Sequence, residues 1–313
     1  MSAGFGPRTG RTSLAVSGAR GVTREILSEQ PRRDVIRNTI FAAVLFFAVA
    51  LSLAGLAALI LDTLIKGAPA LNADLITQGP SSISAEGAGL KPAIIGTLWI
   101  MAFVILFIVP IGVGAAIFLE EYANKESRLA RIVEVNIQNL AAVPSIIYGL
   151  LGLAFIARGP LDLGFVVLTA AMTLALLVLP TVIIAAREAI RSVPPSIREG
   201  SLALGATRWQ TIRHQVLPAA VPGIATGVIL AVSRAIGETA PLIPLGAATF
   251  VTFDPSGPFS GFTAVPLQIF DWATDQRDEY QTLAAAGIFV LILLMIAMNA
   301  FAIWLRNRYE QRW

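Results

Sequence analysis

Long apolar runs alternate along the chain with shorter polar connections. A helix of about 20 apolar residues is long enough to cross the hydrocarbon core of a bilayer. Runs of this kind lie at 39–61, 93–118, 135–157, 163–186, 218–251 and 282–305. The pattern predicts an all-α integral membrane protein with six transmembrane helices.

The fifth run is too long for one straight helix. The apolar stretch extends from Val216 to Val251 and contains Gly237, Pro241 and Pro244, residue types that interrupt helices. A broken helix at membrane depth is tolerated only where its freed backbone faces protein or a wet cavity. We therefore expect this helix to break, and we expect a solute path near the break.

Composition agrees with a membrane protein. Hydrophobic residues make up 56% of the chain and charged residues 14%, and the mean hydropathy is +0.73. Cysteine is absent and there is one histidine, so the sequence offers no disulfide, thiolate or metal site, and we expect no cofactor. The net charge is +3. In a membrane protein, basic residues in the loops set the orientation of the spans, so we do not interpret this charge as a nucleic-acid-binding surface and expect no nucleic-acid partner.

Lysine and arginine are distributed unequally between the two sides of the predicted spans. Of the 23 basic residues, 18 lie in the two tails and in the loops after the second and fourth spans, and only four lie on the opposite side. The positive-inside rule therefore places both termini in the cytoplasm. We divide the chain into a loosely ordered tail (1–38), an uncleaved first transmembrane helix (39–65), a transmembrane core (93–305) with a cytoplasmic loop (187–217), and a C-terminal tail (306–313).

The cytoplasmic loop contains residues that are typical of the starts and ends of two short helices. Pro194 and Pro195 end the preceding span. Ser196 and Glu199 have the S-x-x-E form of a capping box, which predicts the start of a new helix. Gly205 can end that helix.

A second helix is predicted directly after the first. Thr207 and Gln210 repeat the capping box as T-x-x-Q. On the first helix, Ile197, Ser201 and Leu204 share one face at i, i+4 and i+7 spacing. A short helix with such a face fits either docking into a groove of a soluble partner or lying on the lipid surface.

The same loop resembles a signature of the bacterial ABC-transporter permeases, namely E-A-A, three residues, G, nine residues and I-x-L-P. This chain matches at Glu199, Gly205, Leu217 and Pro218, and it departs in having Gly200 and Ser201 for the alanines and Gln215 for the isoleucine. In that family the short helix docks into a cleft of the ATP-hydrolysing subunit. The resemblance therefore implies docking, through Ile197, Glu199, Gly200, Ser201, Leu204 and Gly205.

Three further stretches narrow the resemblance. "VPIGVGAAIFLEEYA" (109–123), "NLAAVPSIIYGLLGL" (139–153) and "SRAIGETAPL" (233–242) are similar to segments of PstA-type phosphate permeases, and the similarity covers about 93–305. It implies a MetI-like type I importer permease fold in the bacterial inner membrane. The implied partners are a second permease subunit (PstC type), a dimer of ATP-binding subunits (PstB type), an extracytoplasmic phosphate-binding protein (PstS type) and membrane lipid. The chain contains no G-x-x-x-x-G-K-[ST] phosphate loop, so ATP hydrolysis belongs to a separate chain and this subunit is not an enzyme.

Two charges interrupt the fifth apolar run. An arginine near the bilayer centre costs about 2.5–3.5 kcal/mol on insertion scales, so Arg234 needs a compensating role. It is one helical turn from Glu238, and the two could simply neutralise each other. Alternatively, the planar guanidinium holds an oxyanion bidentately while Glu238 orients it and Thr239 adds a hydroxyl.

Two hydroxyl side chains in the third run are further candidates for the solute path. Ser145 and Tyr148 follow Pro144, which can kink the helix and free a carbonyl. Hydrogen bonds within or between helices are an equally good explanation of both hydroxyls.

An inorganic-phosphate importer subunit is thus the leading functional hypothesis. Sulfate and molybdate are oxyanions that an arginine could also hold, and they remain the nearest alternative. A passive channel would not need a cytoplasmic loop that docks on an ATP-hydrolysing subunit. An intramembrane hydrolase lacks paired aspartates, H-E-x-x-H or a serine with a base within the spans.

Overall fold

The computed structural model describes residues 32–124, 126–246 and 251–309. The chain forms two compact units, residues 1–62 and residues 63–313. Throughout the described residues the secondary structure is helical, apart from one isolated antiparallel bridge between Val166 and Gly261. The expected all-α class is confirmed.

The first unit is described from α2 (Arg32–Gly67), a helix of 36 residues whose last turn lies in the second unit. This helix begins inside the tail expected at 1–38, and residues 1–31 lie outside the described residues. Side chains from Val35 to Asp62 are exposed. A helix that is apolar on all sides needs lipid or another helix around it, which agrees with a transmembrane segment.

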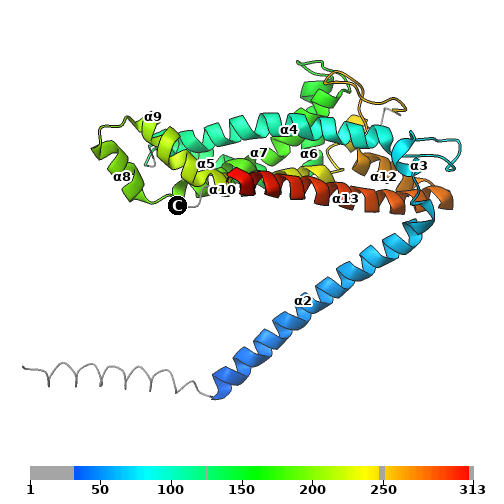
Figure 1. The fold of residues 1–313 in the computed structure, drawn as a ribbon, viewed down its shortest axis with the longest axis horizontal. Coiled ribbons are helices and arrows are strands. Elements are labelled where there is room, and N and C mark those ends of the chain that lie inside the picture. The colour runs from blue at the N-terminus through cyan, green and yellow to red at the C-terminus, as the bar shows by residue number, and fades with distance from the viewer. Residues whose placement is uncertain (1–31, 125, 247–250, 310–313) are drawn as a thin grey trace, which may run out of the picture. The chain divides into compact units, whose positions relative to one another are not determined.

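Four long helices dominate the second unit. They are α4 (Lys91–Ile117), α7 (Val167–Arg191), α10 (Leu217–Gly237) and α13 (Asp278–Tyr309). The central helix is α7, which packs against both α4 and α10. Of its most apolar stretch of 18 residues, 67% is buried. In turn, α13 packs on α10, so that these helices run side by side (Figure 1). Their shared core contains Val104, Leu174 and Ala231.

Short elements gather at the two ends of this bundle. One end holds η1 (Ala68–Ala70), α3 (Asp74–Thr77) and α12 (Val265–Thr274), and α12 packs on the start of α13. The other end holds α8 (Pro195–Ala203) and α9 (Arg208–Thr211), which Figure 1 shows together beyond α10. A π-helical turn, η4 (Ile212–Val216), joins α9 to α10 without a break in the helical path.

The third predicted span is sharply bent. It consists of α5 (Arg128–Ala141), α6 (Ser145–Leu151) and the π-helical η3 (Gly152–Ala157), and the two halves meet at 102°. Pro144 stands at the bend, where it lacks an N–H and pushes the preceding residue out of the helical region. The kink expected at Pro144 within the run 135–157 is present, and it is sharp enough to divide the run into a bent pair of helices.

Five described helices are long and apolar enough to cross a membrane, and the bent pair makes a sixth if its halves form one span. The fifth apolar run breaks as predicted, because α10 ends at Gly237 and a four-residue helix, α11 (Ile243–Gly246), follows it. Residues 247–250 of that run lie outside the described residues, as do residues 310–313 of the expected tail 306–313.

Candidate functional site

The Arg234–Glu238 pair lies where α10 ends. Arg234 is in the last helical turn and its Nε donates to Glu238 Oε1 at 3.1 Å. Glu238 is the C-cap residue, with an extended backbone at φ −78° and ψ 112°. A cation in this position is favoured by the negative end of the helix dipole. The two charges therefore do meet, and they do so at the break in the apolar run.

Arg234 has hydrogen-bond donors that its pairing with Glu238 does not use. Its side chain is 43% exposed and that of Glu238 only 19%. Within the part of the chain that the structure describes, neither terminal guanidinium nitrogen of Arg234 has a hydrogen-bond acceptor. Because Glu238 occupies only Nε, the two terminal nitrogens can together face the oxygens of a tetrahedral oxyanion.

The segment after α10 packs tightly against α6. A Cβ atom placed on Gly149 would lie 2.5 Å from the carbonyl oxygen of Pro241, so the two backbones are in direct contact. This contact places α6, which carries Ser145 and Tyr148, against the segment that follows α10.

The hydroxyls in this region differ in their hydrogen bonding. Tyr148 is buried, and its hydroxyl donates to the Leu140 carbonyl at 2.8 Å. That carbonyl is the one an unbroken helix would have bonded to residue 144, which is a proline without an N–H. Ser145 and Thr239 are half-buried, and neither hydroxyl has a partner among the described residues. Tyr148 thus stabilises the bend, while Ser145 and Thr239 can bond a solute.

The start of α8 differs from the prediction. The helix begins at Pro195 with Pro194 as its N-cap, and no side chain caps it. Proline is favoured in the first turn because its φ is already helical and its missing N–H leaves nothing unsatisfied. Ser196 is consequently inside the helix, and the capping box proposed for Ser196 and Glu199 is wrong.

The rest of the loop has the structure that its sequence predicts. Thr207 and Gln210 form a reciprocal capping box at the start of α9. Gly205 has φ +84°, a left-handed conformation that suits glycine and ends α8.

The predicted apolar face of α8 is only partly available for docking. Ile197 is 37% exposed, and Leu204, which lies just past the helix end, is 90% exposed. Ser201 instead shares a 2.9 Å hydrogen bond with the Thr211 hydroxyl and joins α8 to α9. Glu199 and Gly200 are also exposed.

Sequence reasoning missed two buried carboxylates, Glu120 and Glu121, at the end of α4. They lie in η2 (Phe118–Tyr122), a π-helical turn, and they pair with Arg187, Arg191 and Arg198. The signal was present in the sequence, because two consecutive acids close an apolar run and arginines are in excess in the later loop. Nothing local indicated which arginine would meet which acid.

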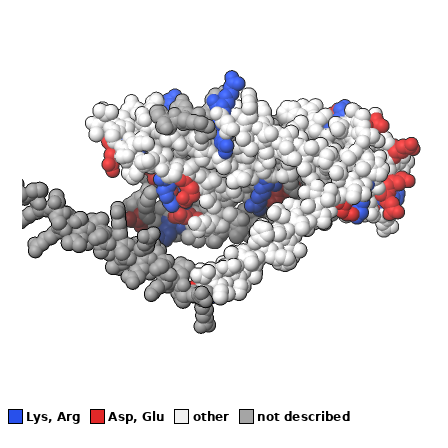
Figure 2. Space-filling model, turned by 60° about the horizontal axis from the view of Figure 1, so that its bottom comes forward, with Lys and Arg blue, Asp and Glu red and all other residues white. Residues whose placement is uncertain are grey.

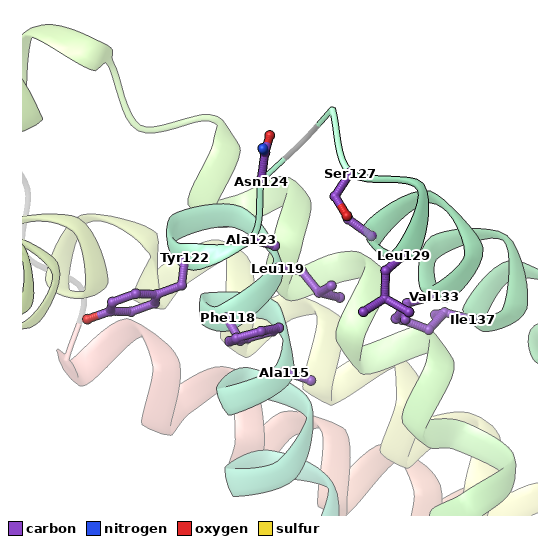
Figure 3. Close-up of a pocket in the computed structure, with 11 residues that line it drawn as sticks. Ala115, Phe118, Leu119, Tyr122, Ala123, Asn124, Ser127, Leu129, Val133 and Ile137 are labelled. Carbon is purple, nitrogen blue, oxygen red and sulfur yellow. The ribbon is translucent and has the colours of Figure 1, made fainter.

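A cavity of about 390 Å³ lies between the end of α4 and α5 (Figure 3). Leu119 of η2 and Val133 and Ile137 of α5 face it, and Asn124 and Ser127 lie at one end. The lining is mostly apolar and includes none of the five residues predicted for the solute path. It is therefore unsuited to an oxyanion.

The visible surface agrees with a protein embedded in lipid. Figure 2 shows a face that is mostly uncharged, with lysine, arginine, aspartate and glutamate gathered in a few groups. Water-facing protein surfaces normally mix charges throughout. The exposed apolar side chains of α4, such as Leu98, Leu106 and Ile111, therefore belong against lipid or other membrane helices.

Comparison with known proteins agrees with this architecture. Residues 108–313 match the family described as "Binding-protein-dependent transport system inner membrane component". The phosphate transport system permease protein PstA of Haemophilus influenzae is 33% identical over 266 residues, which cover 84% of this chain and 92% of that protein. The probable ABC transporter permease protein YqgI of Bacillus subtilis is 31% identical over 256 residues, covering 77% and 85%.

Solved structures show the same fold at low identity. A bacterial ABC transporter involved in alginate import aligns over 90% of this chain and all of its own, with a TM-score of 0.61 and 18% identity. An inward-facing MetNI methionine transporter aligns over 71% of this chain and 94% of its own, with a TM-score of 0.55 and 16% identity. The helical core, the helix broken at a charge pair and the matched residues together place the chain in the family of multi-pass inner-membrane permeases of binding-protein-dependent ABC importers.

Proposed function

We propose that this chain is the PstA-type permease subunit of an importer of inorganic phosphate. The observation that carries the proposal is the position of Arg234, which is half-exposed in a broken apolar helix with two nitrogens open. The similarity to PstA proteins over most of the chain supports phosphate as the anion. Glu238 favours it further, because phosphate retains a proton to donate at neutral pH and sulfate does not.

In this proposal, the five residues have separate roles along the path. Arg234 contacts the anion through its terminal nitrogens, and Glu238 orients Arg234 and balances its charge when the path is empty. Ser145 and Thr239 offer hydroxyls to the anion. Tyr148 holds the bend that places Ser145 near the end of α10. One such site is half of a path, so a second permease subunit of PstC type supplies the other half.

In the same proposal, other subunits of the complex supply the energy for transport. An extracytoplasmic binding protein of PstS type delivers phosphate, and a dimer of PstB-type subunits hydrolyses ATP. One of these ATPase subunits docks on α8 through the exposed face around Ile197, Glu199, Gly200, Leu204 and Gly205, with Ser201 holding α8 to α9. Both termini lie in the cytoplasm, on the side of this loop.

The test is transport by the reconstituted complex. An ammonium cannot make the planar two-point contact, so Arg234→Lys should lose most phosphate uptake although the charge remains. The double variant Arg234→Gln with Glu238→Gln should assemble and hydrolyse ATP but move little phosphate. Near-normal uptake by the double variant would mean that the two charges only neutralise each other. Competition by sulfate or molybdate at concentrations equal to phosphate would instead move the assignment to another oxyanion.

A further inference from the structure

The end of α4 presents two adjacent carboxylates to the protein interior. Successive residues in an α-helix point about 100° apart, whereas the wider π-helical turn of η2 reduces that angle. The turn is closed by the Ala123 N–H bonded to the Phe118 carbonyl at 2.8 Å. As a result, the side chains of Glu120 and Glu121 are only 3% and 10% exposed. Buried carboxylates require paired donors.

Glu120 ties α4 to α7. Its Oε1 accepts from Arg187 Nε at 3.0 Å and from Arg191 at 2.8 Å, and these arginines are one turn apart on α7. Arg187 also reaches Glu134 on α5 at 3.2 Å. Helices α4, α5 and α7 are thus joined through the Arg187 guanidinium, which pairs with both Glu120 and Glu134.

Glu121 ties α4 to α8. Both Nε and Nη2 of Arg198 donate to its Oε1, at 3.0 and 2.9 Å. The same guanidinium donates to the carbonyls of Ile190 and Val193, at the end of α7. These carbonyls belong to the region where a helix end leaves acceptors without intrahelical donors. Arg198 is therefore bonded to α4 and α7 at once while it is itself part of α8.

Arg198 lies next to the docking face of α8 in sequence but points the other way. Ile197 and Glu199 are exposed, whereas the Arg198 side chain is only 23% exposed. A force applied to the exposed face therefore reaches the bundle through this guanidinium. In addition, α8 is bonded to α9 through the Ser201–Thr211 pair, and α9 continues through η4 into α10. The loop therefore has one link to α4 and α7 and another toward α10.

We propose that Arg198 is a positioning residue that links α8 rigidly to α4 through Glu121 and to α7 through the carbonyls of Ile190 and Val193. The inference rests on the proposed docking of an ATPase subunit on α8. When the ATPase moves α8, the ends of α4 and α7 move with it because Arg198 holds all three. Without the link, ATP is hydrolysed but the membrane helices do not follow.

The experiment uses the full complex with its ATPase and binding protein. Glu121→Gln and Arg198→Lys each remove part of the link, while Glu188→Gln is a matched control in the same region, since Glu188 is 66% exposed and contributes one 3.3 Å contact to Arg191. We measure co-purification of the ATPase, ATP hydrolysis, and anion transported per ATP. The anion is the one that the unmodified complex transports, so failure of the phosphate assignment leaves this ratio measurable.

We expect both test variants to retain the ATPase and hydrolyse ATP at the level of the control, while anion transported per ATP falls at least about fivefold, the lower end of typical coupling between sites. Because the chain has no cysteine, a pair of substitutions Glu121→Cys and Arg198→Cys can be joined by a short bifunctional thiol reagent. We expect that cross-link to restore the ratio, and the same reagent on either single substitution to leave it low.

Three results would overturn the proposal. One is an unchanged ratio in Glu121→Gln and Arg198→Lys. Another is loss of ATPase co-purification in step with the ratio, which would mean that Arg198 only maintains the fold of α8. The third is a cross-linked pair that stays uncoupled, which would mean that α8 and α4 must separate during transport.

Discussion

Replacing Gly149 with alanine should separate α6 from the end of α10. The new Cβ would lie 2.5 Å from the Pro241 carbonyl oxygen and 2.8 and 2.9 Å from two other backbone atoms of that residue. No side-chain rotation can relieve contacts with backbone. The two segments must therefore move apart by roughly 1 Å, and overpacking of this kind costs about 1–3 kcal/mol.

Gly114→Ala is the matched control, because this glycine lies inside α4 and has no atom within 4 Å of the new Cβ. Alanine favours a helix over glycine by up to about 1 kcal/mol, and the control measures that gain alone. Unfolding in mixed micelles should show Gly114→Ala unchanged or stabilised and Gly149→Ala destabilised. The difference between the two free energies of unfolding isolates the cost of the contact.

Transport should respond in the same direction, because the displaced α6 carries Ser145 and Tyr148 away from Arg234. We expect phosphate uptake by Gly149→Ala to fall about tenfold, equivalent to about 1.4 kcal/mol, with Gly114→Ala unaffected. Equal stability and equal uptake in the two variants would refute the tight contact between α6 and Pro241, and with it the arrangement of the path.

Two further predictions concern the periphery. The Arg277 side chain and backbone lower the pKa of Asp275 from 3.8 to about 2. This contact therefore stabilises the turn fully at pH values well above 3.8, and the stabilisation declines progressively as the pH falls from about 3.8 through about 2. Arg277→Gln should return the midpoint of a carbon-13 titration of Asp275 toward 3.8, and an unchanged midpoint would contradict the assignment. For topology, Ile83→Cys, at a position 91% exposed, should react with an impermeant thiol reagent from outside the cell and Ala203→Cys should not, whereas the reverse labelling pattern would invert the orientation.

Features encoded by neighbouring residues were predictable from the sequence. The break after Gly237 follows from the glycine and two prolines that interrupt one apolar run. The capping box of Thr207 and Gln210 depends on residues three positions apart, and the end of α8 depends on one glycine. In each case the physical cause lies within a few residues, so a pattern in the sequence is enough to locate it.

Predictions failed where two local signals competed or where the partner was distant. At α8, the first-turn preference of Pro195 outweighed the capping tendency of Ser196, and the sequence alone did not rank them. Glu121 and Arg198 are 77 positions apart, and their pairing depends on how α4, α7 and α8 pack. The bend at Pro144 was expected as a kink, but its angle of 102° is set by packing against α7 and the segment after α10.

The carboxylate that neutralises Arg234 is not carried by the helix that carries Arg234. Glu238 already has extended backbone, so the four-residue spacing that resembles a helical pair is maintained by a chain that has left the helix. Rotation of the backbone at this one residue swings the carboxylate away while the guanidinium stays where α10 holds it. In the proposed path, the positive charge that an anion would meet is therefore set by a backbone torsion angle, and movement of the segment after α10 would change the electrostatic potential there.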